Sequence, residues 1–354
     1  MRIVYGISGE GKGHATRSET VISYLQKKGH DVHIFASDFA YTYLKKKYKN
    51  VYELPKVPLF YKNGSLQITK SVAHISVLIP RIFFATCMML RRHYRTYKPD
   101  IIISDFDVFT AMSGGYSKIP VIAANNISLI RHTPQQRIPG PRFWPVFVDF
   151  FATWQATQYV IPAFISTPKH PANVTITAPA IRQQIKKLKP TNGKRVLVYQ
   201  TSPTNTQLLA TLKQTNTEYI IYGYGARPKE RNLTFHAFNE TTFYKHLAAA
   251  KAVILGGGFT LLTEAIYLRK PILCVPLRHH YEQCFNAHHI AKEQFGEYIQ
   301  EPTPDDVEAF LRSCGKYAGA MKRYLIDPNE FPRTVLEQAE QLTRSSSTDY
   351  TAHG

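Results

Sequence analysis

Residues 3–14 read IVYGISGEGKGH, and they set the expectation for the fold. Ile3 to Ile7 form a short apolar run that predicts a buried strand, and the glycine-rich segment after it predicts a tight loop. A helical pattern follows, with Val21 and Leu25 on one face, and Gly29 ends it before a second apolar run at residues 32–36. The order strand, loop, helix and strand is typical of a βαβ unit in a parallel sheet.

The same alternation recurs along the chain and predicts two domains. Short apolar segments stand at residues 100–104, 119–124, 196–199, 219–222, 252–255 and 271–275. We therefore expect an α/β protein with two doubly wound, Rossmann-like parallel-sheet domains that face each other across a cleft. The N-terminal domain is expected over 1–180, a linker over 181–192 and the C-terminal domain over 193–344. The polar residues 345–354 are expected to form a disordered tail.

Positive charge is concentrated in the first half of the chain. The 354 residues contain 44 Lys and Arg against 25 Asp and Glu, a formal charge of +19. Residues 1–190 hold 26 of the basic and 9 of the acidic side chains, an excess of +17 that leaves +2 for the rest. Such a surplus favours polyanions or acidic membranes as partners. Nucleic acid is not expected, because the sequence has no zinc finger, aromatic RNA-binding motif or basic helix repeat.

The cysteines and the apolar segments indicate a cytoplasmic protein. The four cysteines form no Cys-x-x-Cys pair, which favours a reducing compartment over a disulfide framework or a zinc site. The N-terminus lacks the apolar run of a signal peptide. The long apolar stretch from Val72 to Leu90 is interrupted by His74, Pro80 and Arg81, so we do not expect it to cross a membrane.

The loop before the first helix carries the first candidate catalytic residue. Its pattern Gly9-x-Gly11-x-Gly13-His14 differs from the Gly-x-Gly-x-x-Gly of dinucleotide sites in placing His14 at the mouth of the helix. A dehydrogenase is an alternative, since Asp38 follows the second strand where a ribose-binding acid would stand. An imidazole at a strand's carboxyl end is suited to taking a proton near neutral pH. The alternative role for His14 is a helix cap.

Two aspartates follow the apolar segment at residues 100–104. Asp105 is expected at the same sheet edge as His14, where its carboxylate can bind the far imidazole nitrogen and stabilise the charged ring. With Asp107 it forms an Asp-x-Asp pair, which could also hold Mg²⁺ or Mn²⁺ against a diphosphate. A third interpretation is that a loop aspartate here caps the helix near residues 110–116.

Residues 254–287 are the most informative stretch of the sequence. A strand leads to three glycines at 256–258 and a helix N-terminus, whose N–H groups and dipole can stabilise a diphosphate without a metal. Glu264 stands about one turn and a half along that helix. There its carboxylate can accept hydrogen bonds from two ribose hydroxyls. The loop after the next strand offers polar groups for sugar hydroxyls at His280, Glu282 and Gln283.

These motifs together resemble the nucleotide-sugar glycosyltransferases of the GT-B fold. The likeness is to UDP-glucuronosyltransferase-like proteins and to the lipid-linked N-acetylglucosaminyltransferases of peptidoglycan synthesis. It is carried mainly by residues 252–287 and also by 1–36 and 99–107. The resemblance implies a UDP-sugar donor in the C-terminal domain and an acceptor in the N-terminal domain. It also implies transfer of a hexosyl group with inversion, needing neither a metal nor a cofactor.

The resemblance implies roles for the candidate residues. His14 matches the general base and Asp105 its orienting acid, while Gly256 departs from the histidine of plant-type members, so phosphate binding has to rest on backbone groups. The loop at residues 200–204 lacks the glycines of the peptidoglycan enzymes. On the donor side, the diphosphate is expected at Gly257, Gly258, Phe259, Thr260 and Thr201, the ribose at Glu264, and the sugar at His280, Glu282 and Gln283. On the acceptor side, Gly11, Gly13 and Arg131 are the candidates.

The nature of the acceptor is predicted from charge. Basic residues at 45–47, at 91–98 and in the segment 131–142, with Phe143 and Trp144 after it, suit peripheral binding to anionic lipid and a lipid acceptor. The alternative is that residues 72–90 form an ordinary core helix with a solvated basic end. Two other functions stay open at this point: a UDP-sugar epimerase on the same fold, and a non-catalytic nucleotide-binding module.

Overall fold

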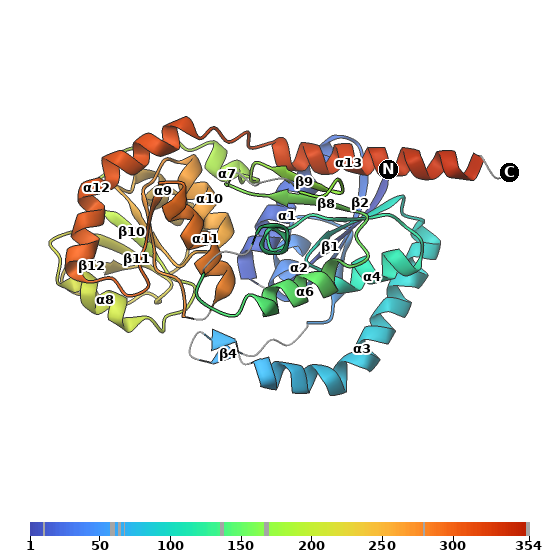
Figure 1. Cartoon of the computed structure of the whole chain (residues 1–354), viewed down its shortest axis with the longest axis horizontal. Coiled ribbons are helices and arrows are strands. Elements are labelled where there is room, and N and C mark those ends of the chain that lie inside the picture. Colours follow the sequence, from blue (N-terminus) through green and yellow to red (C-terminus); the bar gives the residue numbers. More distant parts are fainter. Residues whose placement is uncertain are drawn as a thin grey trace.

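The computed structural model describes residues 1–9, 11–56, 61–62, 65–66, 68–134, 138–165, 170–278 and 280–351. The chain forms two α/β domains that lie side by side along the long axis of the molecule (Figure 1). Each domain has its own parallel sheet with helices packed on it, so the predicted doubly wound architecture is confirmed. A small antiparallel pair, β4 (Tyr61–Lys62) and β5 (Ser65–Leu66), stands apart from both sheets.

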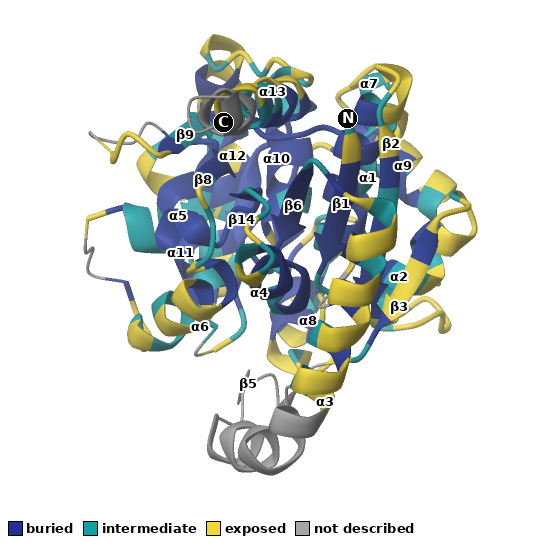
Figure 2. Cartoon of the chain, turned by 90° about the vertical axis from the view of Figure 1, so that its right-hand side faces the viewer, coloured by how far each residue is buried: buried dark blue, intermediate teal, exposed yellow. Residues whose placement is uncertain are grey.

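The N-terminal sheet has seven parallel strands in the order β3-β2-β1-β6-β7-β8-β9. Helices cover both of its faces, and its central strands are therefore continuous apolar runs that are buried (Figure 2). The register pairs Ile7 with Asp105, so the carboxyl ends of β1 and β6 share one edge. The strands are β1 (Arg2–Ile7), β2 (Asp31–Ser37), β3 (Val51–Leu54), β6 (Ile101–Asp105), β7 (Val121–Ala123), β8 (Gln158–Pro162) and β9 (Val174–Thr177).

The C-terminal sheet has six parallel strands in the order β12-β11-β10-β13-β14-β15. In both sheets the strand order reverses beside the first strand, between β1 and β6 and between β10 and β13. Such switch points are where open α/β sheets bind ligands. The strands are β10 (Val196–Tyr199), β11 (Tyr219–Tyr222), β12 (Leu233–Phe235), β13 (Val253–Leu255), β14 (Ile272–Cys274) and β15 (Gly296–Tyr298).

Some helix starts carry side-chain caps. Thr303 and Asp306 form a reciprocal capping box at the start of α12, with Pro304 as its first residue. The helices of the N-terminal half are α1 (Gly11–Lys27), α2 (Asp38–Lys45), α3 (Ile68–Tyr97), α4 (Val108–Tyr116), α5 (Ser128–His132) and α6 (Phe143–Thr153). Those that follow are α7 (Gln183–Lys186), α8 (Thr206–Lys213), α9 (Glu240–Ala249), α10 (Phe259–Tyr267), α11 (Tyr281–Lys292), α12 (Pro304–Arg323) and α13 (Glu330–Thr351).

Helix α13 crosses back from the C-terminal domain and packs on the N-terminal one (Figure 1). Its apolar residues Phe331, Val335 and Ala339 are completely buried in the same cluster as Ile3 of β1. The sequence assigned residues 330–344 to the C-terminal domain and 345–354 to a disordered tail. The helix is continuous through Thr351, which corrects both assignments for the described residues, and residues 352–354 lie outside them. The reason is that Phe331, Val335 and Ala339 are spaced so that they lie on one face of the helix, and this apolar face packs on the N-terminal domain.

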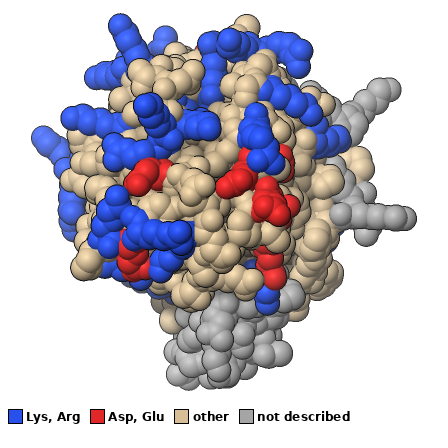
Figure 3. All heavy atoms as spheres, turned by 90° about the vertical axis from the view of Figure 1, so that its left-hand side faces the viewer, with Lys and Arg blue, Asp and Glu red and all other residues tan. Residues whose placement is uncertain are grey.

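The stretch from Val72 to Leu90 lies inside the 30-residue helix α3. No helix of the described residues is long and apolar enough to span a membrane. The cysteines are all free thiols. Figure 3 shows the end of the molecule formed by the C-terminal domain, where acidic side chains lie among the lysines and arginines, as the small charge excess of this half leads one to expect.

Candidate active site between the domains

The loops that follow the switch-point strands lead into two helices that meet at the domain boundary. In the N-terminal domain this helix is α1, which begins at Gly11. In the C-terminal domain it is α10, whose N-cap residue Gly258 provides no side-chain cap. A Cβ placed on Gly13 would lie 3.1 Å from Oγ1 of Thr260, so the first turns of α1 and α10 are neighbours. Two helix N-termini this close favour a negatively charged ligand.

His14 lies in the first turn of α1 and is oriented by Asp105. Its Nδ1 is 2.8 Å from Oδ1 of Asp105, which is completely buried at the end of β6. An ionised carboxylate only accepts hydrogen bonds, so a neutral imidazole bonded to Asp105 carries its proton on Nδ1 and has its lone pair on Nε2; Nη2 of Arg17 lies 3.1 Å from the same Nδ1. The ring of Phe106 stacks on the imidazole with 5.9 Å between centroids, and the His14 side chain is 12% exposed. This is the tautomer that a general base needs.

Arg17 and Ser18 keep the carboxylate of Asp105 ionised. Arg17 donates from Nε to Oδ2 at 3.0 Å and from Nη2 to Oδ1 at 2.5 Å, and Ser18 Oγ donates to Oδ2 at 2.9 Å. Burial alone would raise the pKa of Asp105, but the charge of Arg17 and the hydrogen-bonded His14 outweigh it and lower the pKa below its ordinary value. Arg17 was missed from the sequence, although its position three residues after His14 places it on the same helix face.

Asp107 has a different role from Asp105. It is the N-cap of α4, where Oδ2 accepts hydrogen bonds from the backbone N of Thr110 at 2.8 Å and from its hydroxyl at 2.6 Å. The carboxylates of Asp105 and Asp107 therefore bind different partners and do not act as a pair. Among the described residues no cluster of three His, Cys, Asp or Glu side chains could hold a metal ion. The helix-cap interpretation holds for Asp107, and the orienting interpretation fits the geometry of Asp105.

The pH dependence of stability gives a test of this capping role. Burial raises the pKa of Asp107 to about 6, against the hydrogen bonds of Thr110, which lower it. An acid with a raised folded-state pKa stabilises the fold most below its unfolded pKa, and this contribution is lost as the pH rises through about 6. Asparagine keeps the capping oxygen but does not ionise. We expect the melting temperature of Asp107→Asn, relative to the wild type, to rise between pH 4 and pH 7 in thermal unfolding scans; an unchanging difference would contradict this.

A chain of hydrogen bonds joins the His14–Asp105 pair to the C-terminal domain. Arg17 Nη1 donates to Oδ1 of Asn126 at 2.5 Å, and Asn126 Nδ2 donates to Oε1 of Glu282 at 3.0 Å. Glu282 is one of the predicted donor-sugar residues and stands in the first turn of α11. The structure therefore brings His14, Asp105 and Glu282 into one network across the boundary. Asn126 was also missed, although it follows the apolar segment at residues 119–124 at the carboxyl edge of the sheet.

The second glycine loop leaves the N-terminus of α10 open. Gly257 has a positive φ of 94°, and a Cβ there would lie 2.7 Å from the backbone O of Gln283, so this position requires glycine. Asn286 fixes the loop by donating from Nδ2 to the backbone O of Gly257 at 3.0 Å. A Cβ on Gly258 would meet nothing within 4 Å. Space is thus free at the helix end where the sequence predicts the diphosphate.

The other predicted donor residues lie in the neighbouring loops. Gln283 is buried and accepts from the backbone N of Leu277 at 3.0 Å, and His280 is the N-cap of α11, so both brace the loop after β14. Thr201 is exposed in the loop after β10. The preceding residue, Gln200, is fully buried, and neither end of its amide has a hydrogen-bond partner among the described residues. Its Oε1 lies 3.3 Å from the Cβ position of Gly256, beside the glycine loop.

The predicted ribose acid Glu264 is held by an arginine of the linker. Arg182 donates from Nε and Nη2 to the two carboxylate oxygens of Glu264, which is fully buried, and its guanidinium lies 4.8 Å from the ring centre of Tyr244. Lys12 adds a second cation, with Nζ 3.8 Å from the ring centre of Phe238 across the domain boundary. Both carboxylate oxygens of Glu264 therefore already have a hydrogen-bond partner in Arg182. No local pattern in the sequence points to this pair.

Arg131 is engaged within the N-terminal domain. Its Nε lies 3.1 Å from Oδ2 of Asp149, which is buried, and its guanidinium lies over the ring of Tyr159. This arginine therefore ties α5 to α6, and its charge is neutralised there. Asp38, the ribose acid of the dehydrogenase alternative, forms an ion pair with Lys56 at 2.5 Å on the surface.

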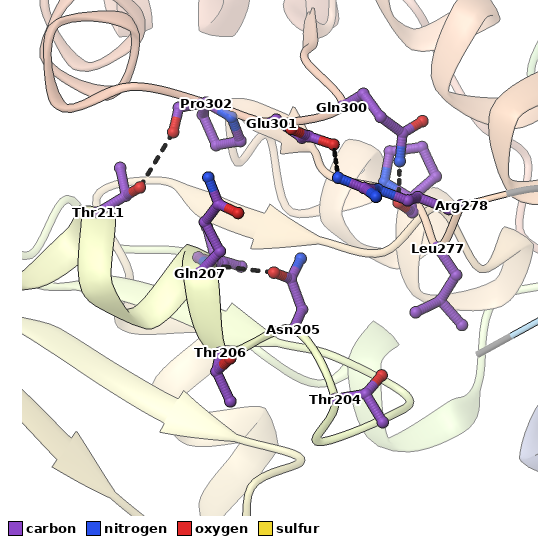
Figure 4. A pocket seen from close by; sticks show the side chains of 12 residues that line it. Thr204, Asn205, Thr206, Gln207, Thr211, Leu277, Arg278, Gln300, Glu301 and Pro302 are labelled. Atoms are coloured by element: carbon purple, nitrogen blue, oxygen red, sulfur yellow. Dashed lines mark hydrogen bonds and ion pairs between the residues drawn. The ribbon is translucent and has the colours of Figure 1, made fainter. Parts of the chain in front are cut away.

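A cavity of about 540 Å³ opens on the C-terminal domain, among the loops after β10, β14 and β15 (Figure 4). Its polar side chains are bonded to neighbouring protein groups: Arg278 to Glu301, Gln300 to the backbone O of Pro276, and Thr211 to the backbone O of Pro302. None of the predicted site residues lines it. His14 and Asp105 lie outside this cavity.

A family comparison covers most of the chain. A sequence model of glycosyl transferase family 1 matches residues 1–314. An uncharacterized glycosyltransferase of Methanosarcina acetivorans is 24% identical over 340 residues, which cover 87% of this chain and 88% of that protein. One from Methanosarcina mazei is 23% identical over 388 residues, covering 96% of this chain and 98% of that protein.

Solved structures of similar fold cover nearly the whole chain. Spinosyn forosaminyltransferase SpnP has a TM-score of 0.66 at 13% identity, with 97% of this chain and 99% of that chain covered. MurG of Acinetobacter baumannii has a TM-score of 0.62 at 16% identity, with coverage of 96% and 100%. Glycosyltransferase VinC in complex with dTDP has a TM-score of 0.63 at 13% identity, with coverage of 98% and 100%. At these identities the likeness shows a shared fold.

Proposed function

Because the chain belongs to glycosyl transferase family 1, we propose that it transfers a hexosyl group from a UDP-sugar to the hydroxyl of a lipid or membrane-associated acceptor. The observation that carries the proposal is the placement of the His14–Asp105 pair against the open N-terminus of α10. A base and an anion-binding helix end, one from each domain, are the two parts that displacement at an anomeric carbon requires. We further propose that the protein works in the cytoplasm, at the inner face of the membrane.

The reaction proposed is a single displacement with inversion. Nε2 of His14 takes the proton of the acceptor hydroxyl as its oxygen bonds to the anomeric carbon, and the bond from that carbon to the diphosphate oxygen breaks with UDP as leaving group. Asp105 stabilises the imidazolium that forms. The N–H groups at the start of α10 stabilise the charge on the departing diphosphate. We propose no metal or cofactor for these steps; the backbone N–H groups of α10 take the charge of the diphosphate, and Lys12 is a nearby cation.

Donor recognition is assigned to the C-terminal domain. Glu264 would accept hydrogen bonds from the ribose hydroxyls after Arg182 has given up one of its hydrogen bonds to that carboxylate. Glu282 would accept a hydrogen bond from a hydroxyl of the sugar. The dTDP in the VinC structure belongs to that protein, and it supports a nucleoside diphosphate sugar as the donor class here. We assign UDP because the glycine loop and Glu264 resemble those of UDP-sugar enzymes.

A thermal-shift screen of nucleotide sugars tests the donor. A ligand that binds the folded state alone raises the melting temperature with its concentration. We expect UDP and at least one UDP-hexose to raise the melting temperature. The same UDP-hexose should release UDP slowly in water and faster when an acceptor is present. A shift with GDP- or dTDP-sugars and none with any UDP-hexose would overturn the UDP assignment. Binding without any turnover would favour the non-catalytic module.

Replacing Gly258 by alanine tests the diphosphate position. The added methyl group meets no protein atom within 4 Å, and the loss of a glycine N-cap costs about 1 kcal/mol at most. It enters open space at the N-cap of α10, the helix end where we place the diphosphate. We expect UDP affinity to fall by at least about tenfold, equivalent to 1.4 kcal/mol, measured by calorimetry. Gly319→Ala on α12, where a Cβ also meets nothing within 4 Å, is the matched control and should bind UDP normally.

A further inference from the structure

Helix α6 exposes a row of aromatic rings to solvent. Its residues Phe143, Phe147 and Phe151, with the C-cap Trp154, follow one another at spacings of four, four and three residues, which places them on one helix face. Neighbouring ring centroids in this aromatic row are 5.7, 6.0 and 6.2 Å apart. Their side chains are 45% to 66% exposed. A solvent face made of large rings is unusual for a helix of a globular domain.

The polar residue of α6 points inward. Asp149 lies on the opposite side of the helix, fully buried, and accepts from Ser128 Oγ at 2.6 Å. Arg142, just before the helix, donates to the backbone oxygens of Ile130 and Thr133 at 2.9 and 2.8 Å. These contacts fix the orientation of α6 on the domain. The aromatic row is therefore presented outward by the fold.

Helix α3 presents a second apolar surface on the same side of the N-terminal domain. Helix α4 packs between α3 and α6, and Figure 2 shows the exposed residues of both flanking helices on this side. Leu90 and Tyr94 face the core, whereas Phe84, at 68% exposed, and Met88 face solvent. The exposed face then continues one and two turns further as Arg91, Arg92 and Arg95.

The charge around these helices favours an anionic lipid surface over a protein partner. Residues 82–98 of the sequence contain no acidic side chain, and the one acid of α6 is buried. The surface therefore combines aromatic rings with arginines and offers no carboxylate. Aromatic side chains favour the boundary between lipid headgroups and acyl chains, and each arginine near an anionic surface adds attraction that salt screens.

We propose that the aromatic row of α6 and the exposed face of α3 together dock the protein on a membrane containing anionic lipid. Docking here would hold the N-terminal domain, which carries His14, at the surface where a lipid acceptor lies, so the inference rests on the proposed function for the identity of the acceptor alone. The binding itself depends on the described surface. The expected depth is that of an interfacial helix, without crossing the bilayer.

Tryptophan fluorescence tests the docking directly. The chain has two tryptophans, so Trp144→Phe leaves Trp154 as the one reporter. With vesicles of phosphatidylcholine and phosphatidylglycerol, we expect its emission to shift to the blue and to be quenched by brominated phosphatidylcholine. Vesicles of phosphatidylcholine alone should bind more weakly, and added salt should reduce the difference. Unchanged emission and no quenching with either vesicle would overturn the proposal.

Two charge substitutions and a control separate docking from other effects. Phe147→Glu with Phe151→Glu should lower vesicle partitioning at least about 100-fold, because burial of each ring contributes about tenfold or more. Leu325→Glu, at a side chain 82% exposed between α12 and α13, should leave it unchanged. Melting temperature and UDP affinity should be unchanged in all variants, so a failed donor assignment remains distinguishable from failed docking. If the double variant instead converts a dimer to a monomer in light scattering, with vesicle partitioning unchanged, the surface is a contact between two copies and the proposal is wrong.

Discussion

Replacing His14 by alanine will lower the rate of sugar transfer by about 10²- to 10⁴-fold, the usual contribution of a positioned general base. The imidazole is held by Asp105 at 2.8 Å with Nε2 free, and no other imidazole contacts that carboxylate among the described residues. UDP affinity should change little, because the proposed diphosphate contacts come from α10. The measurements are initial rates with the UDP-hexose found in the screen and calorimetric titration of UDP.

A pH profile distinguishes a base from a packing residue. The pH profile of kcat/KM of the wild type should contain a limb that His14→Ala lacks, because the variant has no general base at this position. His14→Gln, which keeps a side chain able to bond Asp105, should be equally inactive. If either variant retained wild-type kcat/KM and its pH dependence, the role of His14 as base would be refuted.

Substituting Asp105 by asparagine is expected to damage both activity and stability. The amide cannot stabilise an imidazolium and leaves His14 free to adopt the wrong tautomer, for which losses of up to about 10⁴-fold in kcat are typical. It also leaves the guanidinium of Arg17, itself buried, without its anionic partner. Removing one partner of a buried ion pair costs about 3–5 kcal/mol. Urea unfolding measures the loss of stability. Initial rates at urea concentrations below the unfolding transition measure the loss of activity.

Asp107→Asn is the matched control for this substitution, since it changes the same side chain two residues away and retains the α4 cap. It should keep full activity. The lowered pKa of Asp105 also fixes the sign of its pH effect. Its stabilisation is present above the unfolded carboxyl pKa near 4 and is lost as the pH falls through the lower folded-state pKa, so the deficit of Asp105→Asn should shrink in acid. A deficit that grows toward low pH would contradict the ion pair.

Much of the fold was predictable because its signals are local. The strands at residues 3–7 and 101–103 are short runs rich in β-branched residues, and a glycine loop marks the helix start after the first of them. The parallel topology then places the ends of β1 and β6 together, which is why His14 and Asp105 could be paired from the sequence. The open glycine loop before α10 followed from the same reasoning.

The remaining site residues are joined by contacts that no local pattern encodes. Asn126 and Glu282 stand 156 positions apart, and Arg182 reaches Glu264 from the linker. Arg131 was predicted on the acceptor side, and its ion pair with Asp149 is another contact that the sequence did not indicate. The aromatic row of α6 was only half visible, since Phe143 and Trp144 were noted without the spacing that extends the row to Trp154.

The position of α13 has a consequence for how the protein is made. Phe331, Val335 and Ala339 fill the core beside β1, so the packing of β1 is completed only by residues that are synthesised more than 300 positions later. Until α13 has been synthesised, the N-terminal sheet leaves this apolar surface uncovered. Chaperones bind exposed apolar surfaces of this kind during translation. Stalled nascent chains that end before residue 330 should accordingly be digested by protease at β1 and β2, while chains that include α13 resist it.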